Sequence, residues 1–324
     1  MDKILDFRRP GIRGAVVCTA LAAAVMLASS CVRRELYVKP DEGGVVLDFD
    51  WRNLVPGETA PEQMAVYFYG ADGSLTRGVT ENGKFSGILP SGNYKVLVVN
   101  EDVSGVGFTD MENFDKAYAY ALPLNKKAVG EDMWIREPGW LYSSNSGELV
   151  VEKEDTVVQT MVPKPMVQHV VLNIRLTGDV EAVTDVSAAL TGVAPSVRLV
   201  TGECGDGYAS ITELDPQPVE GGYTANVLVF GLQATNPDGS PADNSLRLNM
   251  GFSNGGSQAI EEHVDTGGAV GPTDIEIKIN VDIDVAATSE AGFSAKVTKW
   301  EVISGDMNVD NRPGGVPLAG YENL

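Results

Sequence analysis

The sequence predicts an all-β protein built from β-sandwiches, and three observations support this prediction. From residue 274 to residue 285, isoleucine or valine alternates with a polar residue, which indicates a long strand with one buried face. Shorter alternating stretches recur at 45–51, 64–68, 170–176 and 246–252. Clusters of Gly, Asn and Pro, which favour turns between antiparallel strands, lie at 71–73, 81–83, 220–222 and 236–239. No long stretch has a helical period, and a strand with one dry face needs a second sheet to cover it.

Residues 1–30 have the pattern of a lipoprotein signal peptide. Basic residues come first, an apolar run follows at 15–28, and small residues lead up to Cys31. We expect cleavage between Ser30 and Cys31 and a covalent lipid, including palmitate, on Cys31. An ordinary signal peptide with a chance cysteine is one alternative, since Ala28 stands where a lipobox usually has leucine. A transmembrane anchor is the other, but the run is shorter than the roughly 20 residues that a crossing needs.

The rest of the chain is long enough for two domains. Pro163 and Pro165 interrupt strand-like segments and cannot donate hydrogen bonds to a sheet. An alternative is one strand from Thr156 to Leu176, kinked by these prolines, which would couple the two sandwiches rigidly. We predict a lipidated linker at 31–43, an N-terminal sandwich at 44–165, a C-terminal sandwich at 166–303, and a flexible tail, rich in Gly and Pro, at 304–324.

Composition argues against several functions. The formal net charge of −21 should repel nucleic acid, so we expect no nucleic-acid partner. After processing, only Cys31 and Cys204 remain, and a lipidated Cys31 cannot form a disulfide. The two histidines, His169 and His263, have no zinc-site spacing. Because no nucleophile is paired with a base, we expect no catalytic residue, no metal and no cofactor apart from the lipid.

Residues 105–147 form the least regular part of the predicted N-terminal sandwich, and they are rich in aromatic residues. One interpretation is a loop held over the sandwich edge by its own rings. The other is a surface that stacks on sugars or docks a protein. Trp134 and Trp140 are the residues that would test the sugar-binding alternative.

Several motifs together resemble a known group. They are Arg33-Arg34-Glu35-Leu36 after the cysteine, Asp50-Trp51-Arg52 at the end of the first predicted strand, Leu89-Pro90-Ser91-Gly92-Asn93-Tyr94 at a turn, Ser187-Ala188-Ala189-Leu190-Thr191-Gly192, and the late strand Val297-Thr298-Lys299-Trp300-Glu301-Val302. With these motifs, residues 31–303 resemble the fimbrillin-like lipoproteins, which include anchor and accessory subunits of type V pili. Within that group the chain is most similar to a branch catalogued as a domain of unknown function.

This resemblance implies two tandem transthyretin-like sandwiches held at the outer membrane by the lipid on Cys31. Exposure at the cell surface is expected but stays open, because Arg33-Arg34-Glu35 does not resemble the acid-rich tract that directs such lipoproteins to the outer face. The resemblance implies a non-enzymatic fimbrial anchor or accessory subunit that acts in cell adhesion and meets a fimbrial subunit or another cell-surface protein by strand addition. The alternative function is a surface glycan-binding lipoprotein.

The resemblance also suggests two modification sites. In pilus-shaft relatives, proteolysis after an arginine removes the first strand, and Arg52 stands at the matching place; the alternative, which an anchor requires, is that Arg52 is an uncut strand end. Asp155-Thr156-Val157 matches a three-residue O-glycosylation acceptor, so Thr156 is a candidate for that modification.

Overall fold

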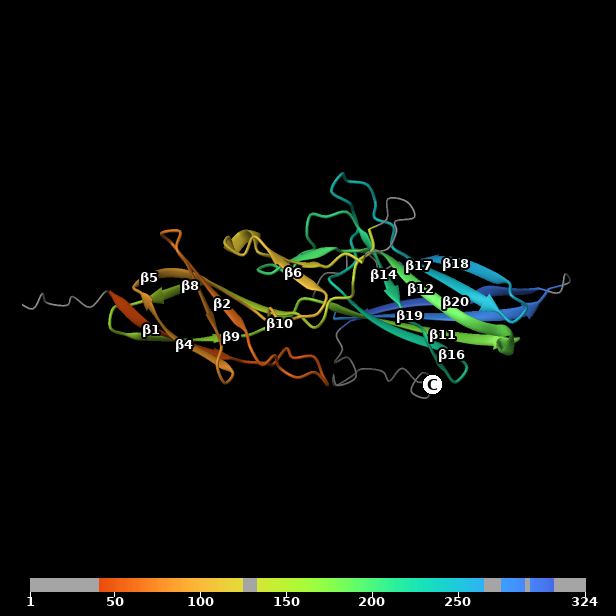
Figure 1. Ribbon diagram of the computed structural model, residues 1–324, viewed down its shortest axis with the longest axis horizontal. Helices are drawn as coiled ribbons and strands as arrows, with labels where there is room; N and C mark the ends of the chain where they lie inside the picture. Colours follow the sequence, from red (N-terminus) through yellow and green to blue (C-terminus); the bar gives the residue numbers. More distant parts are fainter. Residues whose placement is uncertain (1–40, 125–132, 265–274, 289–291, 306–324) are drawn as a thin grey trace, which may run out of the picture. The chain divides into compact units, whose positions relative to one another are not determined.

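The computed structural model describes residues 41–124, 133–264, 275–288 and 292–305 (Figure 1). Ser30, Cys31, most of the predicted linker and nearly all of the predicted tail lie outside the described residues. Helix within the described ranges is limited to two short 3-10 turns, η1 (Phe114–Lys116) and η2 (Val180–Ala182), so the all-β prediction is confirmed. No helix in these ranges is long and apolar enough to cross a bilayer.

Two sheets form the N-terminal half. The smaller has the order β4-β1-β9 and the larger the order β10-β8-β5-β2-β3. Their strands are β1 (Glu42–Phe49), β2 (Ala65–Gly70), β3 (Leu75–Val79), β4 (Lys84–Pro90), β5 (Gly92–Val99), β8 (Tyr142–Val151), β9 (Thr156–Met161) and β10 (Lys164–Pro165). Alternation places Leu47, Phe68 and Val96 in the core between these sheets, and each is fully buried.

Two sheets form the C-terminal half, one of five strands in the order β15-β16-β11-β19-β20 and one of four in the order β14-β12-β17-β18. Their strands are β11 (Gln168–Gly178), β12 (Val183–Val193), β14 (Ser210–Leu214), β15 (Gln217–Val219), β16 (Gly222–Val229), β17 (Ser245–Phe252), β18 (Ser257–His263), β19 (Glu276–Ala287) and β20 (Phe293–Gly305). The alternating segment at 274–285 is therefore most of β19. Its isoleucines and valines from Ile277 to Val285 are almost completely buried, as the alternation predicts.

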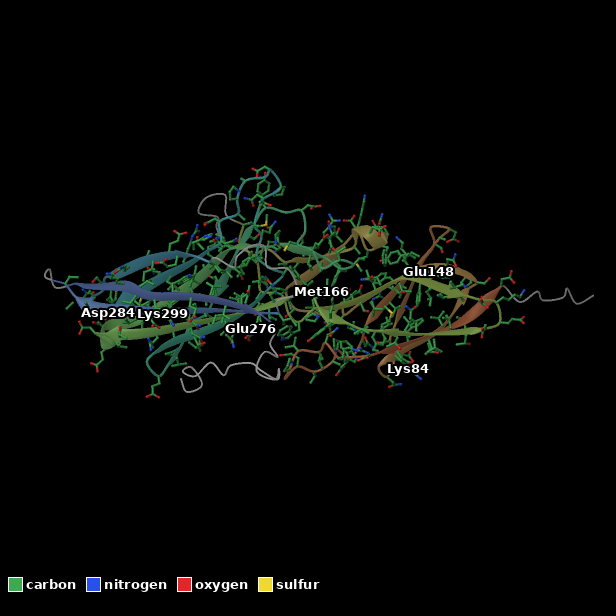
Figure 2. The ribbon with its side chains drawn as sticks, turned by 180° about the vertical axis from the view of Figure 1, so that it is seen from behind. Lys84, Glu148, Met166, Glu276, Asp284 and Lys299 are labelled. Atoms are coloured by element: carbon green, nitrogen blue, oxygen red, sulfur yellow. The ribbon has the colours of Figure 1, made fainter. Side chains whose placement is uncertain are left out.

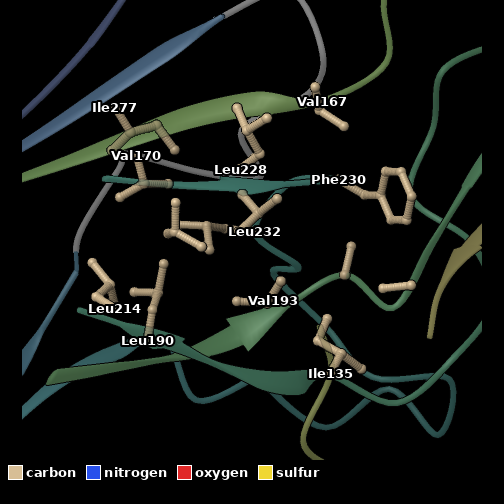
Figure 3. Packing of buried hydrophobic residues seen from close by; sticks show 14 of the residues in the cluster. Ile135, Val167, Val170, Leu190, Val193, Leu214, Leu228, Phe230, Leu232 and Ile277 are labelled. Atoms are coloured by element: carbon tan, nitrogen blue, oxygen red, sulfur yellow. The ribbon is translucent and has the colours of Figure 1, made fainter. Parts of the chain in front are cut away.

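A fifth sheet, of three strands, joins residues from both halves. It consists of β6 (Val106–Thr109), β7 (Tyr118–Ala121) and β13 (Ser196–Arg198), in the order β13-β7-β6. Farther along the same segment, Ile135 packs in one apolar cluster with Val193 and Phe230 (Figure 3). Residues 105–147 are therefore partly regular structure that pairs with the C-terminal half, which the sequence did not predict.

The chain changes sheet twice around the two prolines. β9 belongs to the small N-terminal sheet, β10 to the larger one, and β11 to the C-terminal sheet. The single kinked strand from Thr156 to Leu176 is therefore not formed. Met166 (labelled in Figure 2) and Val167 lie buried between β10 and β11. At the other end, β20 continues to Gly305, two residues past the predicted end of the C-terminal sandwich.

Candidate functional site

The first strand, β1, occupies the middle of the β4-β1-β9 sheet. It pairs antiparallel with β4 from Glu42 to Asp48 and parallel with β9 from Gly44 to Phe49. Val45 and Leu47 point into the core and are 1% and 0% exposed. Removal of β1 would therefore unpair an edge on each side and uncover an apolar groove, which is the geometry that strand addition uses.

Two glycines let the neighbouring turn close over the start of β1. A Cβ atom on Gly43 would lie 2.1 Å from the carbonyl oxygen of Glu152, and one on Gly44 would lie 2.5 Å from the Thr156 hydroxyl oxygen. The amide of Gly44 donates a hydrogen bond to the Asp155 carbonyl at 2.7 Å. The glycines therefore allow a close backbone approach here, rather than an unusual backbone conformation.

Arg52 lies in the turn after β1, because the strand ends at Phe49 and not at Trp51 as predicted. Its side chain is 67% exposed and forms an ion pair with Asp50. The Asp50 carboxylate accepts hydrogen bonds from the Arg52 amide at 3.0 Å and from Arg52 Nε at 2.8 Å. These bonds from Arg52 hold the pKa of Asp50 below its ordinary value. Arg52 is accessible, but its guanidinium is already engaged by a carboxylate.

Thr156 is the first residue of β9 and is exposed. Its amide donates to the Asp155 side chain at 2.7 Å, and its register partner is Gly44. Thr156 therefore stands beside the start of β1, whereas Arg52 follows the end of the same strand. Accessibility is compatible with modification of Thr156, and its glycosylation stays a prediction.

The rings between residues 105 and 147 mostly take part in packing. Trp140 stacks on Tyr142 at 6.5 Å between ring centroids and lies 6.3 Å from the His169 ring. Phe114 meets Tyr69 edge to face at 5.5 Å, and Trp134 is half-buried. These contacts agree with a segment held by its own aromatics. They occupy the ring of Trp140 and leave it poorly placed as a platform for a sugar.

The remaining residues with possible chemistry lie apart from one another. Cys204 is half-buried, and burial raises the pKa of its thiol, which disfavours the nucleophilic thiolate. His169 Nδ1 lies 3.7 Å from a Glu276 carboxylate oxygen, and Lys278 Nζ is 2.9 Å from the other oxygen. Within the described ranges, no group of three His, Cys, Asp or Glu side chains is arranged to hold a metal ion.

Two features of this site were not predicted from the sequence. Alternation identifies β1 as a strand, but the central position and the parallel pairing with β9 depend on a partner far along the chain. The second feature is the carboxylate that engages Arg52. The Asp50-Trp51-Arg52 spacing contains that signal, because an aspartate two residues before an arginine can form such a local pair.

Comparison with solved structures identifies the class of fold. A protein from Bacteroides ovatus described as a candidate adhesin matches with a TM-score of 0.55 and 18% identity, over 81% of this chain and 95% of its own. The fimbrial anchor protein Mfa2 from Porphyromonas gingivalis matches with a TM-score of 0.52 and 12% identity, over 81% of this chain and 97% of its own. At these identities the likeness is one of fold. No curated protein matches the sequence.

The family follows from the sequence itself. Residues 30–213 match the model of a domain of unknown function, DUF5119, so the chain belongs to that family. The match includes Cys31 and Arg52 and extends into β14 of the C-terminal half. The predicted resemblance to a family of unknown function, with the fold of fimbrial proteins, is confirmed.

Proposed function

We propose that this protein is a non-enzymatic, lipid-anchored protein of the outer membrane that serves as an anchor or accessory subunit of a fimbria. The lipid is on Cys31, and the partner is a fimbrial subunit or another cell-surface protein. Support comes from the fold shared with a fimbrial anchor and, above all, from the central position of β1. β1 begins at Glu42, shortly after the proposed lipid site, so the lipid would hold the sandwich through a strand paired on both sides.

Whether the chain acts as an anchor depends on the peptide bond after Arg52. An intact bond keeps β1 joined to the lipid, whereas cleavage separates the lipid from the rest of the sandwich. The Asp50 carboxylate competes with a protease for the Arg52 guanidinium, and the residue lies in a turn rather than in the extended form that proteases bind. Both observations favour the uncut form, and therefore the anchor.

Intact-mass measurement of the membrane-extracted protein tests the proposed anchoring. We expect one species that begins at Cys31, carries lipid and retains residues 31–52. The matched variant Cys31→Ala should leave the membrane fraction while keeping the fold. A mature species that begins after Arg52 would contradict an anchor and favour a polymerising subunit.

With β1 in place, the partner must use another edge, and β20 is a long strand that ends its sheet. Lys296 and Lys299 on β20 should therefore crosslink to the partner in native membranes; Lys299 is labelled in Figure 2. Lys95, on the inner strand β5 and paired with Asp115 at 3.2 Å, provides the internal control. Recovery of a fimbrial subunit through β20 would support the assembly role. Crosslinks to no fimbrial protein would contradict it.

The alternative function, a surface glycan-binding lipoprotein, was suggested by the aromatic residues at 105–147, and the contacts of these residues give it little support. The aromatic segment that suggested it uses its rings for packing, as the contacts of Trp140 and Phe114 illustrate. Glycan binding therefore requires a different surface.

A further inference from the structure

Two cavities open on either side of Asn236 in the C-terminal half. One, of about 430 Å³, is lined by residues from the end of β12, the start of β14 and the start of β17. The other, of about 480 Å³, is lined by residues 204–206 and 232–237. Both are within the range of roughly 300–1,000 Å³ that is usual for small-ligand pockets. Asn236 lines both cavities, so the two are neighbours.

The first cavity, which we call the Tyr208 cavity, lies beside a bulge in β12. β12 pairs with β14 at Leu190 and again at Val193, but the register shifts by one residue between them. Gly192 has φ +74° within this bulge, and a Cβ atom there would clash with the Asn244 side chain. Bulges of this kind interrupt pairing and redirect side chains next to binding sites. The cavity lies over this interruption and is lined by Thr191 and Gly192.

Exposed apolar groups line one part of the Tyr208 cavity. Tyr208 is 57% exposed and Met133 is 52% exposed, and both are unusually accessible for large apolar side chains. Tyr208 lies two residues before β14 and is therefore held close to a paired strand. A tyrosine ring offers a large, rigid face with few rotatable bonds, and such rings often anchor ligands.

Charged groups held in place by hydrogen bonds line the same cavity. Asp243 accepts hydrogen bonds from the Ser245 hydroxyl at 2.7 Å and from Arg247 Nη2 at 3.2 Å. Arg247 Nε donates to Glu261 Oε1 at 2.9 Å. The Thr191 hydroxyl accepts from the Ser245 amide at 2.8 Å and so secures the start of β17. The carboxylate of Asp243 is therefore oriented before any ligand arrives, and its oxygens can accept further hydrogen bonds.

The second cavity adds a buried acceptor. Gln233 is 6% exposed, and its Nε2 donates to the Gly207 carbonyl at 2.9 Å. Within the described residues, the Gln233 side-chain oxygen has no hydrogen-bond partner. Buried polar atoms normally have a partner. Gln233 lines the cavity, so a small turn of its side chain would present this oxygen to a hydroxyl donor there.

Charge and backbone pairing narrow the class of ligand. Arg247 contacts two carboxylates, Asp243 and Glu261, so this part of the surface is acidic and disfavours a phosphate or a sulfated ligand. Strand addition at the start of β14 is blocked, because Ile211 already exchanges backbone hydrogen bonds with Met133 and Ile135 at 2.8 and 2.9 Å. A neutral molecule with many hydroxyls and an apolar face satisfies both conditions.

We infer that the two cavities bind a neutral oligosaccharide. The C–H face of one sugar stacks on Tyr208, hydroxyls donate to Asp243, and a second sugar donates to the Gln233 oxygen in the neighbouring cavity. This role goes beyond the anchoring function and does not depend on it, because the site involves neither Cys31 nor β1.

The test is binding of the full-length processed protein to immobilised neutral glucan, mannan, galactan and xylan oligosaccharides, with dextran sulfate alongside. We expect at least one neutral glycan to bind, and Tyr208→Ala to weaken it by about tenfold or more, as for a tyrosine that anchors a contact. Tyr208→Trp should retain binding because the ring face is kept. Asp243→Asn should weaken binding, since the amide replaces one acceptor oxygen with a donor.

Tyr120→Ala is the matched control, because Tyr120 is an exposed tyrosine that lines neither cavity. It should leave binding unchanged, and unaltered thermal melting should show that each variant folds. Binding of none of the neutral glycans, preference for dextran sulfate, or equal losses in Tyr208→Ala and Tyr120→Ala would each overturn the inference. The anchoring proposal is judged separately by intact mass and membrane fractionation, so either can fail alone.

Discussion

The first strands of the two halves, β1 and β11, occupy the same kind of place but are held differently. Each is an inner strand with an antiparallel neighbour on one side and a parallel neighbour on the other. β1 pairs with β9 over six positions, whereas β11 pairs with β19 over ten, from His169 to Gly178. The two strands therefore share a topology but differ in how firmly they are held. β11 is paired over a longer stretch of the C-terminal half than β1 is in the N-terminal half.

On the face that points away from the core, the side chains of β11 make more contacts with a neighbouring strand than those of β1. On β11, Asn173 donates to Asn280 at 3.0 Å, and Arg175 forms an ion pair with Asp282, both on β19. On β1, the corresponding face contains Gly44, Val46 and Asp48, and its neighbours Ile88 on β4 and Val158 on β9 are 71% and 62% exposed. A polar ladder thus reinforces the backbone pairing of β11, while β1 depends mainly on its backbone bonds and its two buried side chains.

Truncation of a buried leucine should change the free energy of unfolding most. It tests directly whether β11 is held more firmly than β1. Leu172 on β11 and Leu47 on β1 are both 0% exposed. Leu→Ala in a core costs roughly 2–5 kcal/mol, depending on how far the site can collapse. We expect Leu172→Ala near the upper end and Leu47→Ala near the lower end, because a three-stranded sheet can relax more easily around the lost volume. Urea denaturation measures both, and a larger cost at Leu47 would contradict the comparison.

Glycine substitution should give the next largest effect. A Cβ on Gly222 of β16 would lie 1.8 Å from the Ile174 carbonyl oxygen of β11, and backbone of an inner strand cannot move away. We expect Gly222→Ala to cost about 1–3 kcal/mol or more. At Gly44 the nearest atom is the Thr156 hydroxyl oxygen, which can rotate, so Gly44→Ala should cost about 1 kcal/mol or less. Thermal melting of the two variants compares them, and equal losses would show that β1 is held as rigidly as β11.

Much of this fold could be predicted from residue pattern, because alternation is a local property. β19 is the clearest case, since its isoleucines and valines are buried as their period requires. The parallel pairings of β1 and β11 could not be predicted, because their partners lie far along the chain and any strand of matching pattern would satisfy the local rule. β6 and β7 are short, and their pairing with β13 depends on residues that belong to the other half.

The candidate sites were predictable to different degrees. Arg52 could be found because the family resemblance points to a basic residue after the first strand. Tyr208, Asp243 and Arg247 could not, because they come from separate segments with no common spacing and meet only when β14 and β17 flank β12. The carboxylate that engages Arg52 was present in the sequence, but a pair two residues apart is too common to indicate a site.

Removing an ion pair should lower stability by less than the core and glycine substitutions do. The loss should still be larger in the C-terminal half than in the N-terminal half. Asp282 is 9% exposed in its side chain, so Arg175→Gln leaves a nearly buried carboxylate without its guanidinium and should cost about 1–3 kcal/mol. Arg52→Gln removes a mostly exposed pair that water and salt screen, so it should change the urea midpoint much less. Urea midpoints at low and high salt measure both. Equal salt-sensitive losses would mean that the β11 ladder adds nothing beyond a surface pair.

The smallest expected effect is a dependence of stability on pH. Glu276, at the start of β19, has its pKa held below the ordinary value, first by His169 and also by Lys278. A carboxyl with a lowered folded pKa stabilises the fold above its unfolded pKa, and this contribution is lost as the pH falls through the lowered value. Glu276→Gln should therefore lower the melting temperature near neutral pH, and the difference from the parent should shrink below about pH 4.

Glu148→Gln is the control for this measurement, because Glu148 is an exposed residue of β8 (labelled in Figure 2). It should leave the melting profile parallel to that of the parent from about pH 7 to about pH 3. A Glu276→Gln profile that is also parallel to the parent would show that the contacts with His169 and Lys278 contribute no net stability.

The two-sided pairing of β1 has a mechanical consequence. If Cys31 carries the proposed lipid, a pull toward the membrane is applied at the start of β1, and it acts along the strand while the hydrogen bonds to β4 and β9 run across it. Bonds in this arrangement share the load and must shear together, whereas the bonds of a strand peeled from its end break one at a time. Because β1 has a partner on each side, two ladders resist the pull at once. A short strand can thus withstand tension at its N-terminal end even where, as we expect, it contributes less than β11 to equilibrium stability.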